Sequence, residues 1–218
     1  MVAQPKIIIV DDHPLFREGI KLLIENEGIG QVIAEAENGK EFLEMMKKSK
    51  PDLILMDIEM PVMDGLEATK EALARWPGLK ILVISMFSDR DHYENMIAAG
   101  VLGFVLKTSG KQELEKAITN VAKGESYFSN ELLRNIIVSM SKKTSEEEQQ
   151  TEQFEFTDRE MEVLKFFCEG LTTSEIAEKL NRSVKTIEAH RSKLIKKTNA
   201  KNTINLVLYA IKNKLVEI

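Results

Sequence analysis

The fold of this chain is decided by the segment Asp52-Leu-Ile-Leu-Met-Asp57-Ile-Glu-Met-Pro61-Val-Met-Asp64-Gly65. Its apolar residues 53–56 form a short continuous run, which is the pattern of a buried strand. The run ends at the carboxylate of Asp57, and after Pro61 the pair Asp64-Gly65 predicts the start of a helix capped by Asp64. Open α/β sheets hold ligands at the carboxyl ends of their strands, so Asp57 is a candidate site residue if other strands bring partners to the same edge.

Four other short apolar runs share the N-terminal half with this segment, at residues 6–10, 32–34, 80–84 and 103–107. Amphipathic stretches with helical spacing separate them, and the first of these begins at Pro14. The apolar stripe expected for that first helix is Leu15, Phe16, Ile20, Leu22, Leu23 and Ile24. Strands that alternate with helices in this way are typical of βαβ units. We therefore predict a five-stranded parallel sheet with helices on both faces.

Polar side chains stand at the carboxyl ends of four of these strands. Asp11 and Asp12 follow the first strand and Asp57 follows the third, while Ser85 ends the fourth and Lys107 ends the fifth. Parallel strands end at one edge of a sheet, so these five side chains meet if their strands are central neighbours. The sequence alone leaves the strand order open.

Such a cluster would have the chemistry of phosphoryl transfer. Three neighbouring carboxylates raise one another's pKa unless a cation joins them, and oxygen ligands suit a hard ion such as Mg²⁺. A carboxylate can attack a phosphoryl group and form an aspartyl phosphate, while the metal offsets charge on the attacking and transferred oxygens. A lysine and a hydroxyl supply hydrogen-bond donors to the phosphoryl oxygens.

The order and spacing of these residues, with Met60-Pro61 and Asp64-Gly65 after Asp57, resemble the receiver domain of two-component response regulators. The resemblance covers about residues 5–123 and implies a flavodoxin-like fold. It implies that Asp57 is the phosphoacceptor. It also implies a Mg²⁺ site formed by the side chains of Asp12 and Asp57, by Asp11 through water, and by the backbone carbonyl of Glu59.

The same resemblance assigns phosphoryl binding and switching to three further residues. Ser85 is the switch hydroxyl, and Lys107 binds the phosphoryl group. Phe104, three residues before Lys107, matches the aromatic switch position, although an aromatic residue in a strand is as readily part of the core. His13 is interpreted as a solvated neighbour of the acids.

A polar stretch, residues 139–152, divides the chain. It lacks periodic apolar positions and cannot bury enough surface to order itself. Residues 130–138 before it could form one extra amphipathic helix that docks on the first domain. The predicted organisation is a receiver domain at 5–123, an extra helix and flexible linker at 124–153, and a small all-α domain at 154–218.

The C-terminal segment is predicted to form four helices. Thr157 and Glu160 form a capping box at the start of the first, and a second, short helix ends at a tight turn, 181–183. A third helix spans 184–198 and a fourth spans 201–214. Two helices joined by a tight turn are typical of a helix-turn-helix.

The third of these helices has two different faces. Its inward stripe repeats at helical spacing and consists of Ile187, Arg191, Leu194 and Thr198. The opposite face is basic, small and polar, and residues 182–197 hold six Lys and Arg against one Glu. A helix of this kind suits the major groove of DNA, where lysines neutralise phosphates and Glu188 can accept a hydrogen bond from cytosine.

The ordered motif from Thr157 through Gly170, Glu175 and Thr186 to Lys197 resembles the LuxR-type DNA-binding domain. It implies that the third helix reads DNA and that the fourth helps to pair two copies. His190 is interpreted as a phosphate contact or a packed histidine. The expected DNA-binding residues are Ser183, Lys185, Thr186, Glu188, Ala189, His190, Ser192, Lys193, Lys196 and Lys197.

Composition fits two small domains with different partners. The 218 residues carry a net charge of −5, which divides into −8 for residues 1–153 and +3 for the remainder. No apolar run approaches the roughly 20 residues of a membrane-spanning helix, and the N-terminus does not have the pattern of a signal peptide. The single cysteine, Cys168, excludes an internal disulfide. A cytoplasmic location with no membrane partner is expected.

The chain as a whole resembles a response regulator of the NarL/FixJ type, which is not an enzyme. Its implied partners are a histidine kinase and double-stranded DNA with a two-fold site, and it is expected to form a homodimer when phosphorylated or on DNA. One alternative is a DNA binder whose receiver only dimerises, independently of phosphorylation. A second is a Mg²⁺ phosphohydrolase with an Asp nucleophile, although no substrate cap is evident in the sequence.

Overall fold

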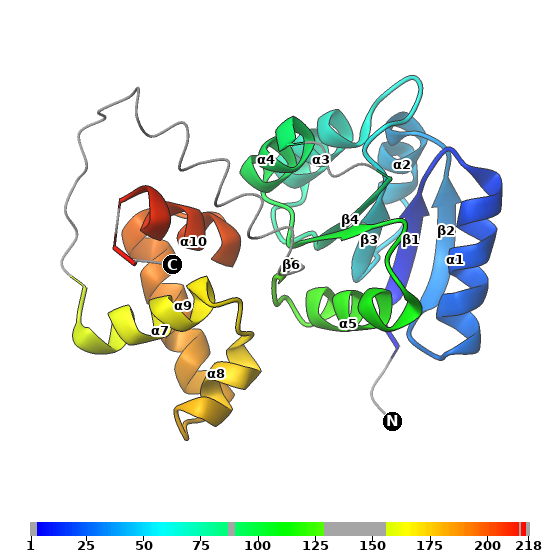
Figure 1. Cartoon of the computed structure of the whole chain (residues 1–218). Helices are drawn as coiled ribbons and strands as arrows, with labels where there is room; N and C mark the ends of the chain where they lie inside the picture. Colours follow the sequence, from blue (N-terminus) through cyan, green and yellow to red (C-terminus); the bar gives the residue numbers. More distant parts are fainter. Residues whose placement is uncertain (1–3, 87–89, 129–155, 214, 217–218) are drawn as a thin grey trace. The chain divides into compact units, whose positions relative to one another are not determined.

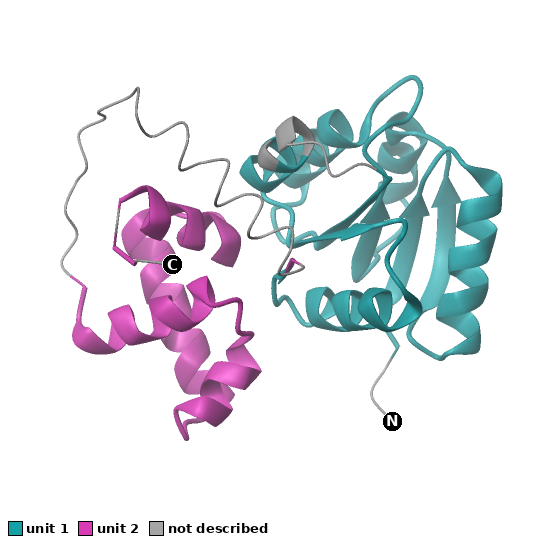
Figure 2. Cartoon of the chain, viewed as in Figure 1, with its two compact units in different colours: residues 1–127 teal, residues 128–218 magenta. Residues whose placement is uncertain are grey.

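The computed structural model describes residues 4–86, 90–128, 156–213 and 215–216. The chain separates into two compact units, residues 1–127 and 128–218 (Figure 2). The extra helix predicted at 130–138 and the linker at 139–152 lie outside the described residues. The predicted domain boundaries therefore stay predictions.

The first unit is built on a sheet with the strand order β2-β1-β3-β4-β5-β6 (Figure 1). All neighbouring pairs among the first five strands are parallel, as predicted. The sixth strand was not predicted; it has only two residues, and its Tyr127 amide donates to the Leu102 carbonyl at 2.9 Å. The strands are β1 (Lys6–Val10), β2 (Gln31–Ala36), β3 (Leu53–Met56), β4 (Ile81–Ser85), β5 (Gly103–Leu106) and β6 (Tyr127–Phe128).

Helices cover both faces of this sheet, which confirms the predicted fold class. Helices α1 (Pro14–Asn26) and α5 (Lys111–Ala122) pack on one face, over a core that includes Ile9, Leu55 and Ile84. The other face is covered by a second group of helices (Figure 1). These are α2 (Gly39–Met46), α3 (Gly65–Arg75) and α4 (Arg90–Ala99). Both faces of the central strands are therefore shielded from solvent, which explains their continuous apolar sequences.

The stripe predicted for α1 was wrong at two positions. Leu15 is 83% exposed and Leu22 is 52% exposed. The buried side of α1 instead contains Arg17, three residues before Ile20 and seven before Ile24. Positions at this spacing share one helix face, so a charged residue occupies a place that an apolar pattern does not reveal.

In the second unit, the described residues form four helices around a core of their own. They are α7 (Asp158–Cys168), α8 (Thr173–Lys179), α9 (Val184–Thr198) and α10 (Thr203–Lys212). The predicted capping box at Thr157 and Glu160 is confirmed, and Thr172 with Glu175 forms a second one at α8. Ile187 and Leu194 of α9 are buried in this core, so the opposite side of α9 is left to solvent.

Candidate functional site

The strand order brings the predicted strand-end residues into one pocket. Strands β1, β3, β4 and β5 lie side by side in that order, so their carboxyl ends are adjacent. A cavity of about 900 Å³ opens there. Its lining includes Asp12, Asp57, Glu59, Ser85 and Lys107. The strand order could not be predicted from the sequence. It is this order that places the strand-end residues next to one another.

Lys107 joins the two buried acids of this pocket. Its Nζ lies 2.6 Å from Asp11 Oδ2 and 2.7 Å from Asp57 Oδ2, and all three side chains are at most 5% exposed. The Lys107 amide donates to the Ser85 carbonyl at 2.7 Å, which anchors the end of β5 to β4. The ammonium group also lies 4.6 Å from the ring centre of Phe16. The lysine is thus placed where it can meet an anion carried by Asp57.

Asp57 is a buried carboxylate held in a defined orientation. Its Oδ1 accepts a hydrogen bond from the Ile58 amide at 2.8 Å, and its own amide donates to the Val10 carbonyl at 2.8 Å. Burial raises the pKa of Asp57, the hydrogen bond from Lys107 opposes this rise, and the neighbouring charge of Asp11 adds to it. A carboxylate with this surplus of negative charge around it favours a bound cation.

The start of α3 is packed tightly against Asp57 because Gly65 has no side chain. Its amide donates to the Ile58 carbonyl at 2.8 Å. A Cβ built on Gly65 would lie 1.9 Å from the carbonyl oxygen of Asp57. The Asp64 side chain caps the same helix by accepting from the Glu67 amide at 2.7 Å, which confirms the predicted cap. Glycine at this position therefore allows the close approach of the helix to the pocket at Asp57.

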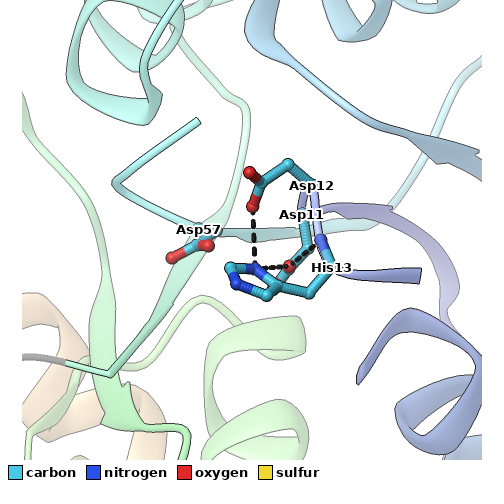
Figure 3. A group of neighbouring side chains, drawn as sticks. All are labelled: Asp11, Asp12, His13 and Asp57. Atoms are coloured by element: carbon cyan, nitrogen blue, oxygen red, sulfur yellow. Dashed lines mark hydrogen bonds and ion pairs between the residues drawn. The ribbon is translucent and has the colours of Figure 1, made fainter. Parts of the chain in front are cut away.

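Asp11, Asp12 and Asp57, together with His13, form a candidate metal centre (Figure 3). Each offers one ligand atom, and these atoms all lie within 4.8 Å of one another. Asp12 Oδ1 is buried and makes no hydrogen bond, although His13 Nδ1 lies 2.8 Å from it. The carboxylate oxygens fit a hard divalent ion.

Arg17 is a residue of this site that the sequence interpretation missed. Its Nη1 donates to the backbone carbonyl of Asp11 at 2.5 Å, and its Nη2 contacts Glu37 at 2.8 Å. The guanidinium thereby ties the loop of the acidic residues to α1 and to the segment after β2. The available signal was its position, because Arg17 shares a helix face with the apolar Ile20 and Ile24.

Ser85 and Phe104 lie on neighbouring strands in the interior. Ser85 is 1% exposed and lines the pocket, and Phe104 is fully buried. The Phe104 ring meets Tyr93 of α4 edge to face, with ring centres 6.3 Å apart. Glu59 also lines the pocket, and its side chain is exposed. Phe104 therefore packs against α4 from the strand next to the one that carries Ser85.

The residues expected to bind DNA lie on α9, where the structure distinguishes between them. Ser183 caps the helix by accepting from the Thr186 amide. His190 is half-buried. Lys197 forms an ion pair within the domain, because its Nζ lies 2.6 Å from Oε2 of the buried Glu160. The exposed members of the predicted set are Ser183, Lys185, Thr186, Glu188, Ala189, Ser192, Lys193 and Lys196.

Comparison with known families explains both units. Residues 7–119 match the response regulator receiver domain, and residues 155–210 match the bacterial regulatory proteins of the luxR family. The chain belongs to the NarL/FixJ family of response regulators. It is therefore a transcription regulator with a DNA-binding helix-turn-helix and an acidic phosphorylation pocket, and not an enzyme.

Relatives of this response regulator cover almost its whole length. The transcriptional regulatory protein DegU of Brevibacillus brevis is 34% identical, over 98% of this chain and 95% of its own. The oxygen regulatory protein NreC of Staphylococcus aureus is 35% identical, over 97% of this chain and 99% of its own. Within the described residues, no helix has the length and apolar character needed to cross a membrane.

Solved structures of similar proteins include one described as two RcsB dimers bound to two parallel DNAs. It is 27% identical, covers 96% of this chain and 98% of its own, and has a TM-score of 0.57. The receiver domain of a putative response regulator NarL from Mycobacterium tuberculosis is 33% identical over 56% of this chain and 99% of its own, with a TM-score of 0.54. A receiver domain implies a kinase partner.

Proposed function

We propose that Asp57 accepts a phosphoryl group from a histidine kinase and that this modification controls DNA binding by the C-terminal unit. The observation that carries the proposal is the position of Asp57 beside Lys107 and the acidic cluster, in a pocket open to a donor. In the reaction, an Asp57 oxygen forms a bond to phosphorus. The bond from phosphorus to the donor's imidazole nitrogen breaks, and its electron pair stays on that nitrogen.

The proposed cofactor is Mg²⁺, held by the side chains of Asp12 and Asp57, by Asp11 through water and by the Glu59 carbonyl. When bound, the ion supplies positive charge that offsets the charge on the attacking and transferred oxygens. The chain's own residues do the remaining work. Lys107 moves its ammonium group from the carboxylates to the new phosphoryl oxygens, and the Ser85 hydroxyl donates to another of them.

Phosphorylation acts on the rest of the receiver through the interior beside the pocket. The new charge draws in Ser85 and Lys107, which changes the packing of Phe104 against Tyr93 of α4. We propose that the altered surface releases or pairs the DNA-binding unit. In this division, residues 5–123 receive the signal, residues 124–153 connect the units, and residues 154–218 bind DNA.

The proposed DNA complex is a homodimer on a two-fold site. A solved structure described as RcsB dimers bound to DNA supports this form of assembly. The exposed side of α9 enters the major groove, where its lysines contact phosphates and where Glu188 and Ala189 face base edges. Lys197 supports the helix from within the domain rather than contacting bases, because Glu160 occupies its ammonium group.

The acceptor assignment is tested by mass spectrometry after incubation with a small acyl phosphate and Mg²⁺. The native protein is expected to gain one phosphoryl group, located on the peptide that contains Asp57. Phosphoryl uptake on a different residue would overturn the assignment. No uptake from either an acyl phosphate or a phosphorylated kinase would overturn the proposed function itself.

A further inference from the structure

His13 lies directly at the acidic cluster, where the sequence suggested only a solvated neighbour (Figure 3). Its imidazole is 63% exposed, yet its Nδ1 points at the acids. The nitrogen lies 2.8 Å from Asp12 Oδ1 and 3.2 Å from Asp11 Oδ1. The His13 amide also donates to Asp11 Oδ1 at 2.8 Å, which fixes the backbone from which the ring projects.

These separations are ordinary for hydrogen bonds and ion pairs, and they also match those of two atoms that bind one metal ion. Ligands at about 2.1 Å from an ion and at right angles to each other lie about 3.0 Å apart. A single N–H can serve only one of the two carboxylate oxygens well. The contact with Asp11 has hydrogen-bond geometry, whereas Asp12 Oδ1 has no hydrogen-bond partner despite its shorter distance. A cation bound by His13 Nδ1 and Asp12 Oδ1, with Asp11 acting through water, would satisfy these atoms.

The arrangement of Lys107 leaves this position available. The ammonium group contacts Asp11 Oδ2 and Asp57 Oδ2. His13 faces the other oxygen of Asp11, Oδ1. A divalent ion held on the His13 side of the acids therefore does not need the oxygen of Asp11 that Lys107 uses.

We propose that His13 Nδ1 is a ligand of the divalent ion in this pocket, beside the carboxylates of Asp12 and Asp57 and with Asp11 acting through water. The proposal rests on the phosphorylation site proposed above and adds the class of metal that the site prefers. Mg²⁺ favours oxygen ligands and water, whereas imidazole favours first-row transition ions. His13 should therefore raise the affinity of the pocket for Co²⁺, Ni²⁺ or Zn²⁺ more than its affinity for Mg²⁺, with Mn²⁺ as an intermediate case.

Pulsed electron paramagnetic resonance of bound Mn²⁺ tests the ligand directly in the full-length protein, purified without a histidine tag. The chain has three histidines, so the double variant His92→Gln/His190→Gln leaves His13 as the only imidazole. Coupling of Mn²⁺ to a directly bound nitrogen is expected in the native protein and in this double variant. It is expected to disappear in His13→Asn. Absence of nitrogen coupling in the native protein would overturn the proposal.

Metal affinity gives a second measurement that separates ligation from general electrostatics. His13→Asn is expected to weaken Co²⁺ binding by about tenfold or more and Mg²⁺ binding by less than about twofold, because water replaces the lost ligand for Mg²⁺ at little cost. Equal losses for both ions, or no loss for either, would contradict the proposal. Phosphoryl uptake with Mg²⁺ but without nitrogen coupling would reject His13 as a ligand and leave the proposed function standing.

Discussion

The phosphorylation pocket and the exposed face of α9 are built in opposite ways. In the pocket, Asp11, Asp57 and Lys107 are at most 5% exposed and hold one another at 2.6–2.7 Å. On α9, residues such as Lys185 and Lys193 are exposed and are brought together only by helical spacing. The side chains of the pocket are held in place by contacts with one another, whereas those on the exposed face of α9 are expected to find their partners on DNA. A single substitution in the pocket should therefore abolish a function or strongly lower stability. A single substitution on the exposed face of α9 should reduce DNA affinity only in part.

The largest effect is expected from Asp57→Asn. The amide lacks the nucleophilic carboxylate, so uptake of a phosphoryl group should be abolished rather than reduced. The measurement is intact-protein mass after incubation with an acyl phosphate and Mg²⁺. Asp52→Asn is the matched control, since Asp52 is an exposed acid outside the pocket and asparagine still offers an oxygen to the Lys6 amide. Loss of uptake in the control as well would mean that the assay reports folding.

Gly65→Ala should be the most damaging small substitution in the receiver. The added methyl group meets the backbone oxygen of Asp57, which cannot move freely, so unfolding free energy should fall by about 3 kcal/mol or more. Urea unfolding of both proteins measures this loss. Gly19→Ala in α1 is the control, because its methyl group meets nothing within 4 Å and should add about 0.5–1 kcal/mol of stability. Similar stability changes in the two variants would contradict the close packing at Asp57.

Two lysines of α9 should differ although they lie four residues apart. Lys193→Ala should weaken DNA binding and lower the salt dependence of affinity by about one phosphate contact, without changing stability. Lys197→Ala should lower the unfolding free energy of the C-terminal unit by about 1 kcal/mol, because it leaves the buried Glu160 without its cation. DNA titrations at several salt concentrations, paired with urea unfolding, separate the two roles. A Lys197→Ala protein of native stability would contradict the structural role.

The smallest expected effect is a pH dependence centred on Glu160. Burial acts to raise the pKa of Glu160, but hydrogen bonds from Lys197 and the Thr157 backbone outweigh it and leave the pKa below 4.5. The charged form is therefore favoured by folding, so its contribution is complete above pH 4.5 and is lost as the pH falls through the lowered pKa. Glu160→Gln should lose less stability than the native protein between pH 6 and pH 3.5.

Cys168 provides the measurement for this pH effect. It is the chain's only cysteine and is buried in the C-terminal core, where burial raises its pKa to about 12. The thiol should therefore react only when this unit opens. A disulfide reagent that is active in acid reports that opening without interference from the receiver. Identical losses of protection in the native and Glu160→Gln proteins would contradict the prediction.

The sequence was a good guide wherever local pattern and burial agree. Five strands appeared as apolar runs, and the capping box at Thr157 and Glu160 and the bounds of α9 followed from short-range rules. The polar residues at strand ends were visible because each interrupts or ends an apolar run. Their convergence depends on the order of the strands, which is set by long-range pairing and not by local sequence.

The features that were missed depend on tertiary contacts. Arg17 is buried because it contacts the Asp11 carbonyl and Glu37, and a pattern of apolar residues could not predict this. Leu15 and Leu22, which the pattern placed on the buried side of α1, are exposed. The ion pair of Lys197 with the buried Glu160 is also a tertiary contact that the sequence did not predict. His13 is another case, since its orientation toward the acids appears only in three dimensions.

Control of DNA binding by Asp57 is tested most directly by equilibrium binding of the phosphorylated and unphosphorylated protein to DNA selected from a random pool. The phosphorylated form should bind about tenfold more tightly or better, within the usual range of coupling between two sites. Asp57→Asn should keep the weaker affinity when the phosphoryl donor is present. Equal affinities for the two forms of the native protein would contradict the account.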